Sequence, residues 1–296
     1  MAWNQLTLYA TQEIAEQLSE LLEGLGAVSV TLKEGGEEEI LEPLPGETPL
    51  WCDTQVVGLF EQEHDMDEVV ATLKQKSGLT NFPQSFIEPV SDQDWERAWL
   101  KDFKPMQFGR RLWIVPSTYE PIDKAAVNIT LDPGLAFGTG THATTALCLQ
   151  WLDENFSSDA EGKDVVDYGC GSGVLAIAAA KLGASHVVAV DIDPQAVIAT
   201  RENAKNNQVS NEIEACLVDD AAEMSADLLL ANILANPLQA LAKLFSESMK
   251  PDGRIVLSGI LSDQVDSVLN VYVQWFEMDE PCYQDGWAML SGKKKS

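Results

Sequence analysis

The amino-acid sequence predicts a two-part α/β protein in which a doubly wound parallel sheet follows a smaller α+β domain. Beyond residue 105, strand-like and helix-like segments alternate regularly, which is typical of parallel sheets. A glycine-rich turn separates a buried strand of that series from the helix after it. The first ninety residues repeat one strand and helix pattern twice, and 296 residues are enough for two domains.

The first ninety residues are expected to fold in the order βαββαβ, the order of a split-βαβ, ferredoxin-like domain. The first helix follows Thr11, a suitable N-cap, and Gly26 closes it. The second helix begins near Asp65 and ends before Gly78, with acidic residues in its first turn and lysines in its last. The expected strands are 6–10, 27–32, 55–60 and 85–90, and the acidic segment 34–49 is expected to be a loop.

The domain boundaries follow from these segments. Residues 1–90 are predicted to form the ferredoxin-like domain, 91–105 a helical linker, and 106–296 the Rossmann-like α/β domain. Trp95 and Trp99 share one face of the expected linker helix, where packing against a domain is their simplest role.

The chain is strongly acidic, with 47 Asp and Glu against 19 Lys and Arg and a formal charge of −28. Such a surface repels phosphate backbones, so direct nucleic-acid binding is disfavoured. Residues 1–105 hold 21 acidic and 6 basic residues, or −15, which indicates either a need for solubility or docking of a basic partner. The basic run Lys293–Lys295 is expected to be a solvated tail.

Cysteine usage and hydropathy limit the class of protein further. The five cysteines are scattered and form no CxxC pair, so we expect reduced thiols, no metal site and no disulfide framework. No run approaches the ~20 apolar residues of a membrane span, and the N-terminus has no secretory signal pattern. These features predict a cytoplasmic protein that binds no membrane, and a monomer, since nothing indicates obligate assembly.

The strongest local motif is the turn within DVVDYGCGSGVLAIAAAKLGA, residues 164–184. A buried strand ends at Asp167, a turn follows, and a helix begins at Val174. The pattern D-x-G-x-G-x-G allows a tight turn and close approach of a ligand to the backbone. It lacks the last glycine of the dinucleotide fingerprint. The turn glycines are Gly169, Gly171 and Gly173.

Acidic residues follow the next two strands of the series. Asp191 ends the strand HVVAVD, where a carboxylate can accept hydrogen bonds from both hydroxyls of a ribose. Asp193 precedes Pro194 and suits a helix N-cap, which leaves Asp191 for a ligand. Asp219 and Asp220 follow the third strand, and Asp219 could meet an adenine amino group.

The fourth strand, ADLLLANI, brings Asn232 to the carboxyl edge of the sheet, where α/β proteins bind ligands. A side-chain amide and backbone carbonyls at this edge can accept hydrogen bonds from an amine. The sequence NILANPL departs from the N-P-P-Y/F pattern of enzymes that methylate planar base or glutamine amides. Together with the acidity of the chain, this departure indicates that a nucleobase is not the substrate.

The segment LDPGLAFGTGTHATTALCL, residues 131–149, combines a glycine-rich loop with the start of a helix. Thr141 could serve as the N-cap of that helix. Phe137 lies on the glycine-rich loop, a place where an aromatic side chain is expected to cover a ligand.

Together these motifs resemble those of class I S-adenosylmethionine-dependent methyltransferases. The LDPGLAFGTGTH loop, NILANPL and LEPLPGET narrow the resemblance to the PrmA family of ribosomal protein methyltransferases, over the whole chain. The resemblance implies a substrate-recognising N-terminal domain and methylation, expected to be trimethylation, of lysine and N-terminal amino groups of large-subunit ribosomal protein eleven. It places cofactor contacts at Thr145, Gly169, Asp191 and Asn232. Ala143 stands where the family is expected to have proline.

Methyl transfer to an amine requires a collinear nitrogen, methyl carbon and sulfur, and a free nitrogen lone pair. A lysine with an ordinary pKa of ~10.4 is mostly protonated at neutral pH, so the site must favour the neutral amine. Asn232, with the carbonyls of Ile233 and Leu234, is expected to orient the amine. Phe137 and His142 are expected to close the site, and His142 is either a proton acceptor or, more commonly for such a histidine, structural.

Two other functions are compatible with the same motifs. A nicotinamide-dependent oxidoreductase would share the fold, although the missing third glycine and the lack of a recognisable proton relay disfavour it. A non-catalytic adaptor could bind basic proteins through the acidic first domain and keep the α/β domain as a scaffold.

Overall fold

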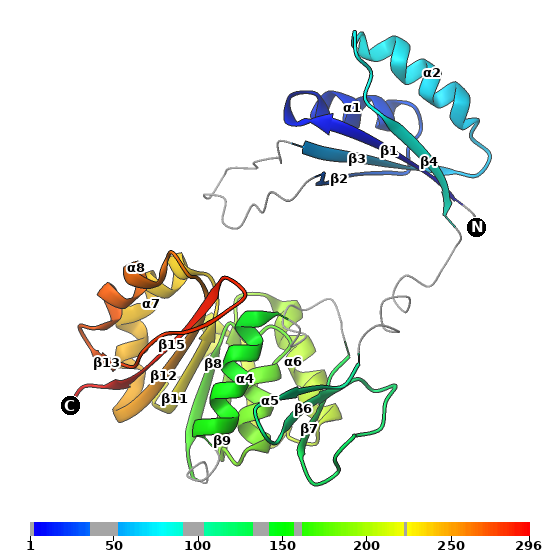
Figure 1. The fold of residues 1–296 in the computed structure, drawn as a ribbon. Coiled ribbons are helices and arrows are strands. Elements are labelled where there is room, and N and C mark those ends of the chain that lie inside the picture. The colour runs from blue at the N-terminus through cyan, green and yellow to red at the C-terminus, as the bar shows by residue number, and fades with distance from the viewer. Residues whose placement is uncertain (1–2, 36–52, 91–103, 133–141, 157–161, 222–223) are drawn as a thin grey trace. The chain divides into compact units, whose positions relative to one another are not determined.

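The computed structural model describes residues 3–35, 53–90, 104–132, 142–156, 162–221 and 224–296. The chain divides into two compact units, residues 1–98 and 99–296, each with its own buried core (Figure 1). The expected linker helix and most of the expected 34–49 loop lie outside the described residues. Within those residues, no helix is long and apolar enough to span a membrane.

The first unit has the predicted order of strands and helices. Its four-stranded antiparallel sheet has the order β2-β3-β1-β4, the arrangement of a split βαβ fold. Alternate residues of β1 are buried together with apolar residues of both helices, for example Leu6 and Leu8 with Leu18 and Leu73. The elements are β1 (Trp3–Thr11), α1 (Gln12–Gly24), β2 (Ser29–Glu34), β3 (Asp53–Glu61), α2 (Met66–Ser77) and β4 (Ser85–Val90).

The ends of α2 follow the sequence signals closely. Asp65 is the N-cap, and its carboxylate accepts hydrogen bonds from the backbone N–H groups of Asp67 and Glu68. Gly78 ends the helix with a φ of 64°, a left-handed conformation that glycine adopts without strain.

The second unit contains an eight-stranded, doubly wound sheet with the order β10-β9-β8-β11-β12-β15-β13, and β14 pairs with β15. The five strands from β10 to β12 are parallel, and β15 is antiparallel to β12. The strands are β8 (Asp164–Tyr168), β9 (His186–Asp191), β10 (Ile213–Leu217), β11 (Ala226–Asn232), β12 (Met249–Leu261), β13 (Phe276–Met278), β14 (Cys282–Gln284) and β15 (Trp287–Lys294).

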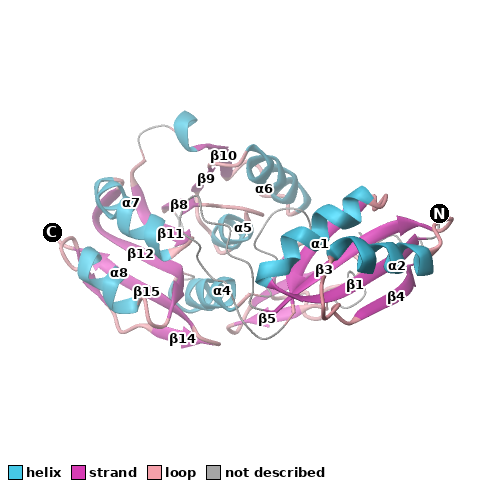
Figure 2. Ribbon diagram, turned by 90° about the horizontal axis from the view of Figure 1, so that it is seen from above, coloured by secondary structure: helices cyan, strands magenta, loops and turns pink. Residues whose placement is uncertain are grey.

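Helices cover both faces of this sheet (Figure 2). Strand residues alternate between two cores, so that Val165 packs on one face and Val166 on the other. The first core includes α4 (Ala143–Asn155), α5 (Val174–Lys181) and α6 (Pro194–Asn206). The second includes α7 (Ala235–Glu247) and α8 (Val265–Tyr272). The predicted doubly wound architecture is therefore confirmed.

A separate three-stranded sheet precedes this architecture. It consists of β5 (Met106–Phe108), β6 (Leu112–Val115) and β7 (Val127–Thr130), with β6 parallel to β7. The carboxylate of the buried Asp153 on α4 accepts hydrogen bonds from the backbone of Arg110 at 2.6 Å and the side chain of Arg111 at 3.3 Å. These contacts join the small sheet to the α/β core.

The prediction of a solvated C-terminal tail is wrong. Lys293 and Lys294 belong to β15, and the ammonium group of Lys293 lies 2.7 Å from a carboxylate oxygen of Asp252. Lys294 and Lys295 donate to the carbonyls of Met249 and Val273 at 2.7 and 2.6 Å. The run is therefore anchored to the fold and is not a free tail, although the side chains of Lys293 and Lys295 stay exposed.

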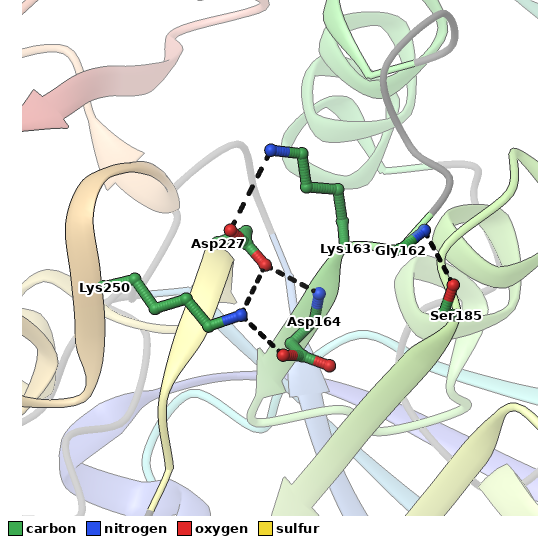
Figure 3. A network of polar contacts seen from close by, with 6 residues as sticks. All are labelled: Gly162, Lys163, Asp164, Ser185, Asp227 and Lys250. Carbon is green, nitrogen blue, oxygen red and sulfur yellow. Dashed lines mark hydrogen bonds and ion pairs between the residues drawn. The ribbon is translucent and has the colours of Figure 1, made fainter.

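A polar network fixes the amino ends of β8 and β11 (Figure 3). The ammonium group of Lys250 lies 2.6 Å from a carboxylate oxygen of Asp164 and 2.8 Å from one of Asp227. The same Asp227 oxygen accepts from the backbone N–H of Asp164 at 2.9 Å. Burial raises the pKa of Asp227, but the hydrogen bonds from Lys250 and from the backbone of Asp164, with the charges of Lys250 and Lys163, together hold the pKa below its ordinary value.

Candidate active site

The carboxyl ends of three neighbouring parallel strands place the predicted site residues side by side. Tyr168 of β8 is in register with Val190 of β9 and Ala231 of β11. Gly169 follows Tyr168, Asp191 follows Val190, and Asn232 follows Ala231. Three residues that are far apart in the sequence therefore meet at one edge of the sheet, as the strand pattern predicts.

The turn between β8 and α5 has the backbone conformation that its glycines permit. Gly169, Gly171 and Gly173 have φ values of 78°, 53° and 78°, in the left-handed region that side chains disfavour. The N–H of Gly171 donates to a carboxylate oxygen of Asp191 at 2.9 Å. The carboxylate thus stabilises the turn at the place where a ligand would approach the backbone.

Asp191, the last residue of β9, and Asp193 accept hydrogen bonds from different backbone groups, and the predicted N-cap role of Asp193 is confirmed. Asp193 is the N-cap of α6 and accepts from the backbone N–H of Gln195 at 2.9 Å, with Pro194 as first helical residue. Asp191 accepts from the N–H groups of Gly171 and Asp193, one on each oxygen. A carboxylate oxygen has two lone pairs, so each oxygen can also accept from a ribose hydroxyl.

Ile192 is a further candidate for the site, which the sequence analysis did not single out. It follows Asp191 directly, and its side chain is 84% exposed. An exposed aliphatic side chain beside a ribose acceptor suits contact with the flat face of a base. The signal was present in the sequence, as an apolar residue between two acidic residues just beyond a strand.

Asp219 lies near the same edge. β10 ends at Leu217, which is in register with Asp191, and Val218–Asp220 form a short 3-10 turn in which Asp219 and Asp220 are exposed. Burial raises the pKa of Tyr168, and the charge of Asp219 raises it further. Asp219 is therefore close to the strand that leads into the glycine turn.

Asn232 and Thr145 meet directly, although 87 residues separate them. The side-chain amide of Asn232 donates to the hydroxyl of Thr145 at 3.2 Å. Thr145 is fully buried on the first turn of α4, and Asn232 is half-buried. Two residues that the family resemblance assigns to the cofactor thus belong to one contact.

The cap of α4 differs from the expectation. His142, and not Thr141, is the N-cap, because the helix begins at Ala143. The His142 ring nitrogen Nδ1 lies 2.8 Å from the hydroxyl of Thr144, and the ring packs edge-on against Trp287 with centroids 4.9 Å apart. Ala143 thus occupies the first helical position, where proline is favoured. Phe137 and Thr141 lie outside the described residues.

The residue after Asn232 connects it to the glycine turn. The Cγ2 methyl of Ile233 lies so close to Gly169 that a Cβ atom there would overlap it. A Cβ at Gly259, on β12, would overlap the carbonyl group of Ile233. Glycines at both positions let the NILANPL segment pack between the turn and β12.

The buried carboxyl of Asp167 lies just before the turn. One oxygen accepts from the backbone N–H of Ala176 at 2.9 Å, and the other is buried without a hydrogen-bond partner in the described part of the chain. Burial raises the pKa of Asp167 to about 7, and the nearby charge of Asp191 contributes in the same direction. The unsatisfied oxygen could accept an N–H donor.

Other chemistries find little support in the described ranges. No group of His, Cys, Asp and Glu there could hold a metal ion. Burial raises the pKa values of Cys148 and Cys170 to about 12, so neither thiol is a ready nucleophile. A cavity of about 250 Å³ lined by Trp151, Lys163 and Arg254 lies at the amino edge of the sheet and contains none of the predicted site residues.

The edge that holds Gly169, Asp191 and Asn232 therefore fits an adenosine-containing ligand. The glycines give the turn its left-handed backbone, Asp191 can accept from a ribose, and Ile192 can contact a base. The amide of Asn232 and the carbonyl groups after it can orient a second, amine-bearing reactant.

Comparisons with known proteins cover the whole chain. The family model described as ribosomal protein L11 methyltransferase (PrmA) matches residues 2–295. Ribosomal protein L11 methyltransferases of Haemophilus influenzae (strain PittEE) and Shewanella amazonensis are 50% and 49% identical over 297 residues, with 100% of each chain covered. The crystal structure of ribosomal protein L11 methylase from Lactobacillus delbrueckii subsp. bulgaricus is 34% identical with a TM-score of 0.59, covering 66% of this chain and 100% of that one.

Proposed function

The chain belongs to the ribosomal protein L11 methyltransferase (PrmA) family, and we propose that it transfers methyl groups from S-adenosylmethionine to amino groups of ribosomal protein L11. The acceptors are lysine side chains and the N-terminal amine, methylated up to the trimethylated state. The observation that carries this proposal is the contact between Asn232 and Thr145 beside the glycine turn.

The residues of the carboxyl edge have distinct roles in this proposal. The glycine turn and Asp191 hold the adenosine part of S-adenosylmethionine, Asp219 lies toward the adenine, and Thr145 and Asn232 lie toward the reactive end. When bound, the cofactor supplies an electrophilic methyl group on a sulfonium. The protein contributes orientation of the two reactants and exclusion of water.

Asn232 orients the acceptor amine. Because its amide nitrogen donates to Thr145, its Oδ1 atom is the end that can accept a hydrogen bond from the amine. The backbone carbonyls of Ile233 and Leu234 offer further acceptors just beyond the strand. An amine held by neutral acceptors in a poorly solvated site is favoured in its uncharged form, whose lone pair can attack. Phe137, which lies outside the described residues, and His142 are proposed to close the site.

Residues 1–90 recognise the protein substrate. The excess of acidic residues in this part of the chain suits a basic ribosomal protein. Tyr9 and Phe86 form an edge-on aromatic pair with centroids 5.8 Å apart, and they are 45% and 46% exposed. Tyr9 points away from the core, because its neighbours on β1, Leu8 and Ala10, are buried, and Phe86 of β4 pairs with Thr7, which shares the Tyr9 face of β1. Exposed aromatic pairs of this kind are common anchors in protein interfaces.

The enzyme is proposed to act as a cytoplasmic monomer without contacting nucleic acid directly. Its negative charge disfavours binding to the phosphate backbones of nucleic acids. Free ribosomal protein L11 is then a sufficient substrate, and ribosomal RNA is not needed for recognition.

Mass spectrometry of purified ribosomal protein L11 incubated with the enzyme and S-adenosylmethionine tests the function. We expect mass increases in steps of one methyl group, located on lysines and the N-terminal amine. If L11 binds to the protein but its mass does not change, the protein is a non-catalytic adaptor. Calorimetric binding of NAD but not of S-adenosylhomocysteine would support the oxidoreductase.

The role of Asn232 has its own test. Asn232→Ala should lower methyl transfer about 100-fold at saturating cofactor, the size of effect seen when an orienting or polar group is lost from an active site. Thr145→Val, which keeps the shape but removes the acceptor of the Asn232 amide, should have a smaller effect in the same direction. Full turnover by Asn232→Ala with cofactor bound would refute the orienting role.

A further inference from the structure

Helix α6 presents polar side chains to the buried side of the site. Thr200, Asn203 and Asn207 are spaced by three and four residues, so they share one face of the helix and its end. Thr200 is 0% and Asn207 4% exposed. Buried polar groups of this kind are costly unless they are hydrogen-bonded. Their partners are backbone groups on other segments.

Two of these side chains hold the carbonyls of the glycine turn. The hydroxyl of Thr200 donates to the carbonyl of Gly171 at 3.1 Å. The amide of Asn203 donates to the carbonyl of Ser172 at 2.9 Å. A Cβ atom at Gly173 would lie 2.7 Å from the Thr200 methyl group, so the turn also packs closely against α6.

Asn207 extends the same set of contacts to β7. Its Oδ1 accepts from the N–H of Thr130 at 2.8 Å, and its amide donates to the carbonyl of Thr130 at 2.7 Å. The amide also donates to the backbone carbonyl of Asn203 at 2.9 Å. The end of α6 is thereby fixed against the small sheet, which limits how far Asn203 can shift.

We propose that Asn203 is a positioning residue for the cofactor, acting through the carbonyl of Ser172 and not by contact with the ligand. This inference rests on the proposed function and deepens it. Glycines are flexible, and a turn with three of them loses much conformational entropy when a ligand orders it. A carbonyl held by Asn203 fixes the Ser172–Gly173 peptide plane beforehand, so binding has less ordering to accomplish.

The inference predicts a specific kinetic pattern. Loss of one neutral hydrogen bond should raise the KM for S-adenosylmethionine and the Kd for S-adenosylhomocysteine about 3- to 10-fold. The kcat at saturating cofactor and the KM for ribosomal protein L11 should stay within about 2-fold, because Asn203 touches neither reactant. A purely structural role would lower the unfolding temperature and leave the KM of the folded enzyme unchanged.

The experiment compares Asn203→Ala with Asn206→Ala in the full-length chain, using calorimetry with S-adenosylhomocysteine and steady-state methylation of L11. Asn206 is an exposed asparagine at the end of the same helix and is the matched control. Asn203→Asp, which keeps the side-chain size but has no donor, should weaken cofactor binding at least as much as Asn203→Ala. It serves as the second variant if the alanine protein fails to fold.

The outcomes separate the two proposals. Weaker cofactor binding in the Asn203 variants alone supports the inference. Equal affinity in Asn203→Ala and Asn206→Ala, with the unchanged chain binding S-adenosylhomocysteine normally, overturns it and leaves the proposed function intact. No binding by the unchanged chain overturns the proposed function, and the inference with it.

Discussion

Gly169 and Ile233 are in such close contact that the turn after β8 and the segment after β11 can only be packed together in the absence of a side chain at 169. Gly169 also has a φ of 78°. The glycine of the turn motif therefore does two things at once: it permits a left-handed backbone, and it makes room for the residue after Asn232. The two motifs form one structural unit at the edge of the sheet.

Replacing Gly169 with alanine tests this packing. Gly169→Ala should lower the free energy of unfolding by about 2–4 kcal/mol, because backbone strain and a steric clash add. It should also weaken S-adenosylhomocysteine binding more than 10-fold in calorimetry, since Ile233 and the turn must move apart. Gly78→Ala is the control: φ there is 64°, but nothing lies within 4 Å of the added Cβ. That variant should cost only about 1 kcal/mol, and its cofactor affinity should not change.

Asp191 and Asp193 provide a second matched pair. Asp193→Ala should lower the unfolding free energy by about 1 kcal/mol through loss of the cap, with cofactor affinity within about 3-fold. Asp191→Ala should weaken S-adenosylhomocysteine binding about 30-fold or more, because two hydrogen bonds to a charged acceptor are lost. Similar affinities of the two variants in calorimetry would contradict the assignment of Asp191 to the ligand.

Both the turn and the aspartates could be predicted from the sequence, because their signals are local. A strand that ends in D-x-G-x-G-x-G, or an aspartate before proline, determines its own backbone conformation within a few residues. Their meeting at one edge also follows from the parallel strand order, since carboxyl ends of parallel strands lie together. The sheet places Gly169, Asp191 and Asn232 directly after three residues that are in register.

The raised pKa of Asp167 predicts a pH dependence of stability. The pKa is about 7 in the folded chain against an ordinary value of 3.8, so the folded state binds this proton more tightly than the unfolded state does. The tighter binding of this proton adds to the free energy of unfolding. This contribution is fully present below the ordinary pKa and is lost as pH rises through about 7. This loss amounts to as much as about 4 kcal/mol. The variant Asp167→Asn, which cannot ionise at this position, should lack this pH dependence of stability.

Urea unfolding of both proteins from pH 4.5 to 8 measures this effect, because the difference between them isolates Asp167 from the other acidic groups. The unfolding free energy of the unchanged chain should fall relative to that of the variant across this range. Parallel curves would show that Asp167 is ionised throughout.

The aromatic pair of the first unit yields a prediction for substrate binding. Tyr9→Ala and Phe86→Ala should each raise the KM for ribosomal protein L11 about 5- to 30-fold, the range of a moderate interface anchor, and leave the KM for S-adenosylmethionine unchanged. Tyr119→Ala, a 40%-exposed tyrosine of the second unit, is the control. An unchanged KM for L11 in both variants would move recognition to another surface of the chain.

Contacts between distant segments explain what the sequence could not predict. The lysines at 293–295 look like a solvated tail because their acceptors, on Asp252, Met249 and Val273, belong to other elements. The antiparallel strands β13 to β15 likewise carry no local signal of where they pair. Asn203 and Asn207 read as ordinary polar helix residues, since only the folded chain places them against backbone groups.

The carboxyl edge of the sheet is the proposed binding site of the methyl donor, and the roles of Asp191, Thr145 and Asn232 all depend on it. A crystal structure of the protein with S-adenosylhomocysteine tests this most directly. We predict the ligand beside the Gly169–Gly173 turn, its ribose hydroxyls on the Asp191 carboxylate and its sulfur facing Asn232. A ligand bound elsewhere, for example in the cavity at the amino edge, or Asp191 and Asn232 turned away from it, would contradict the account.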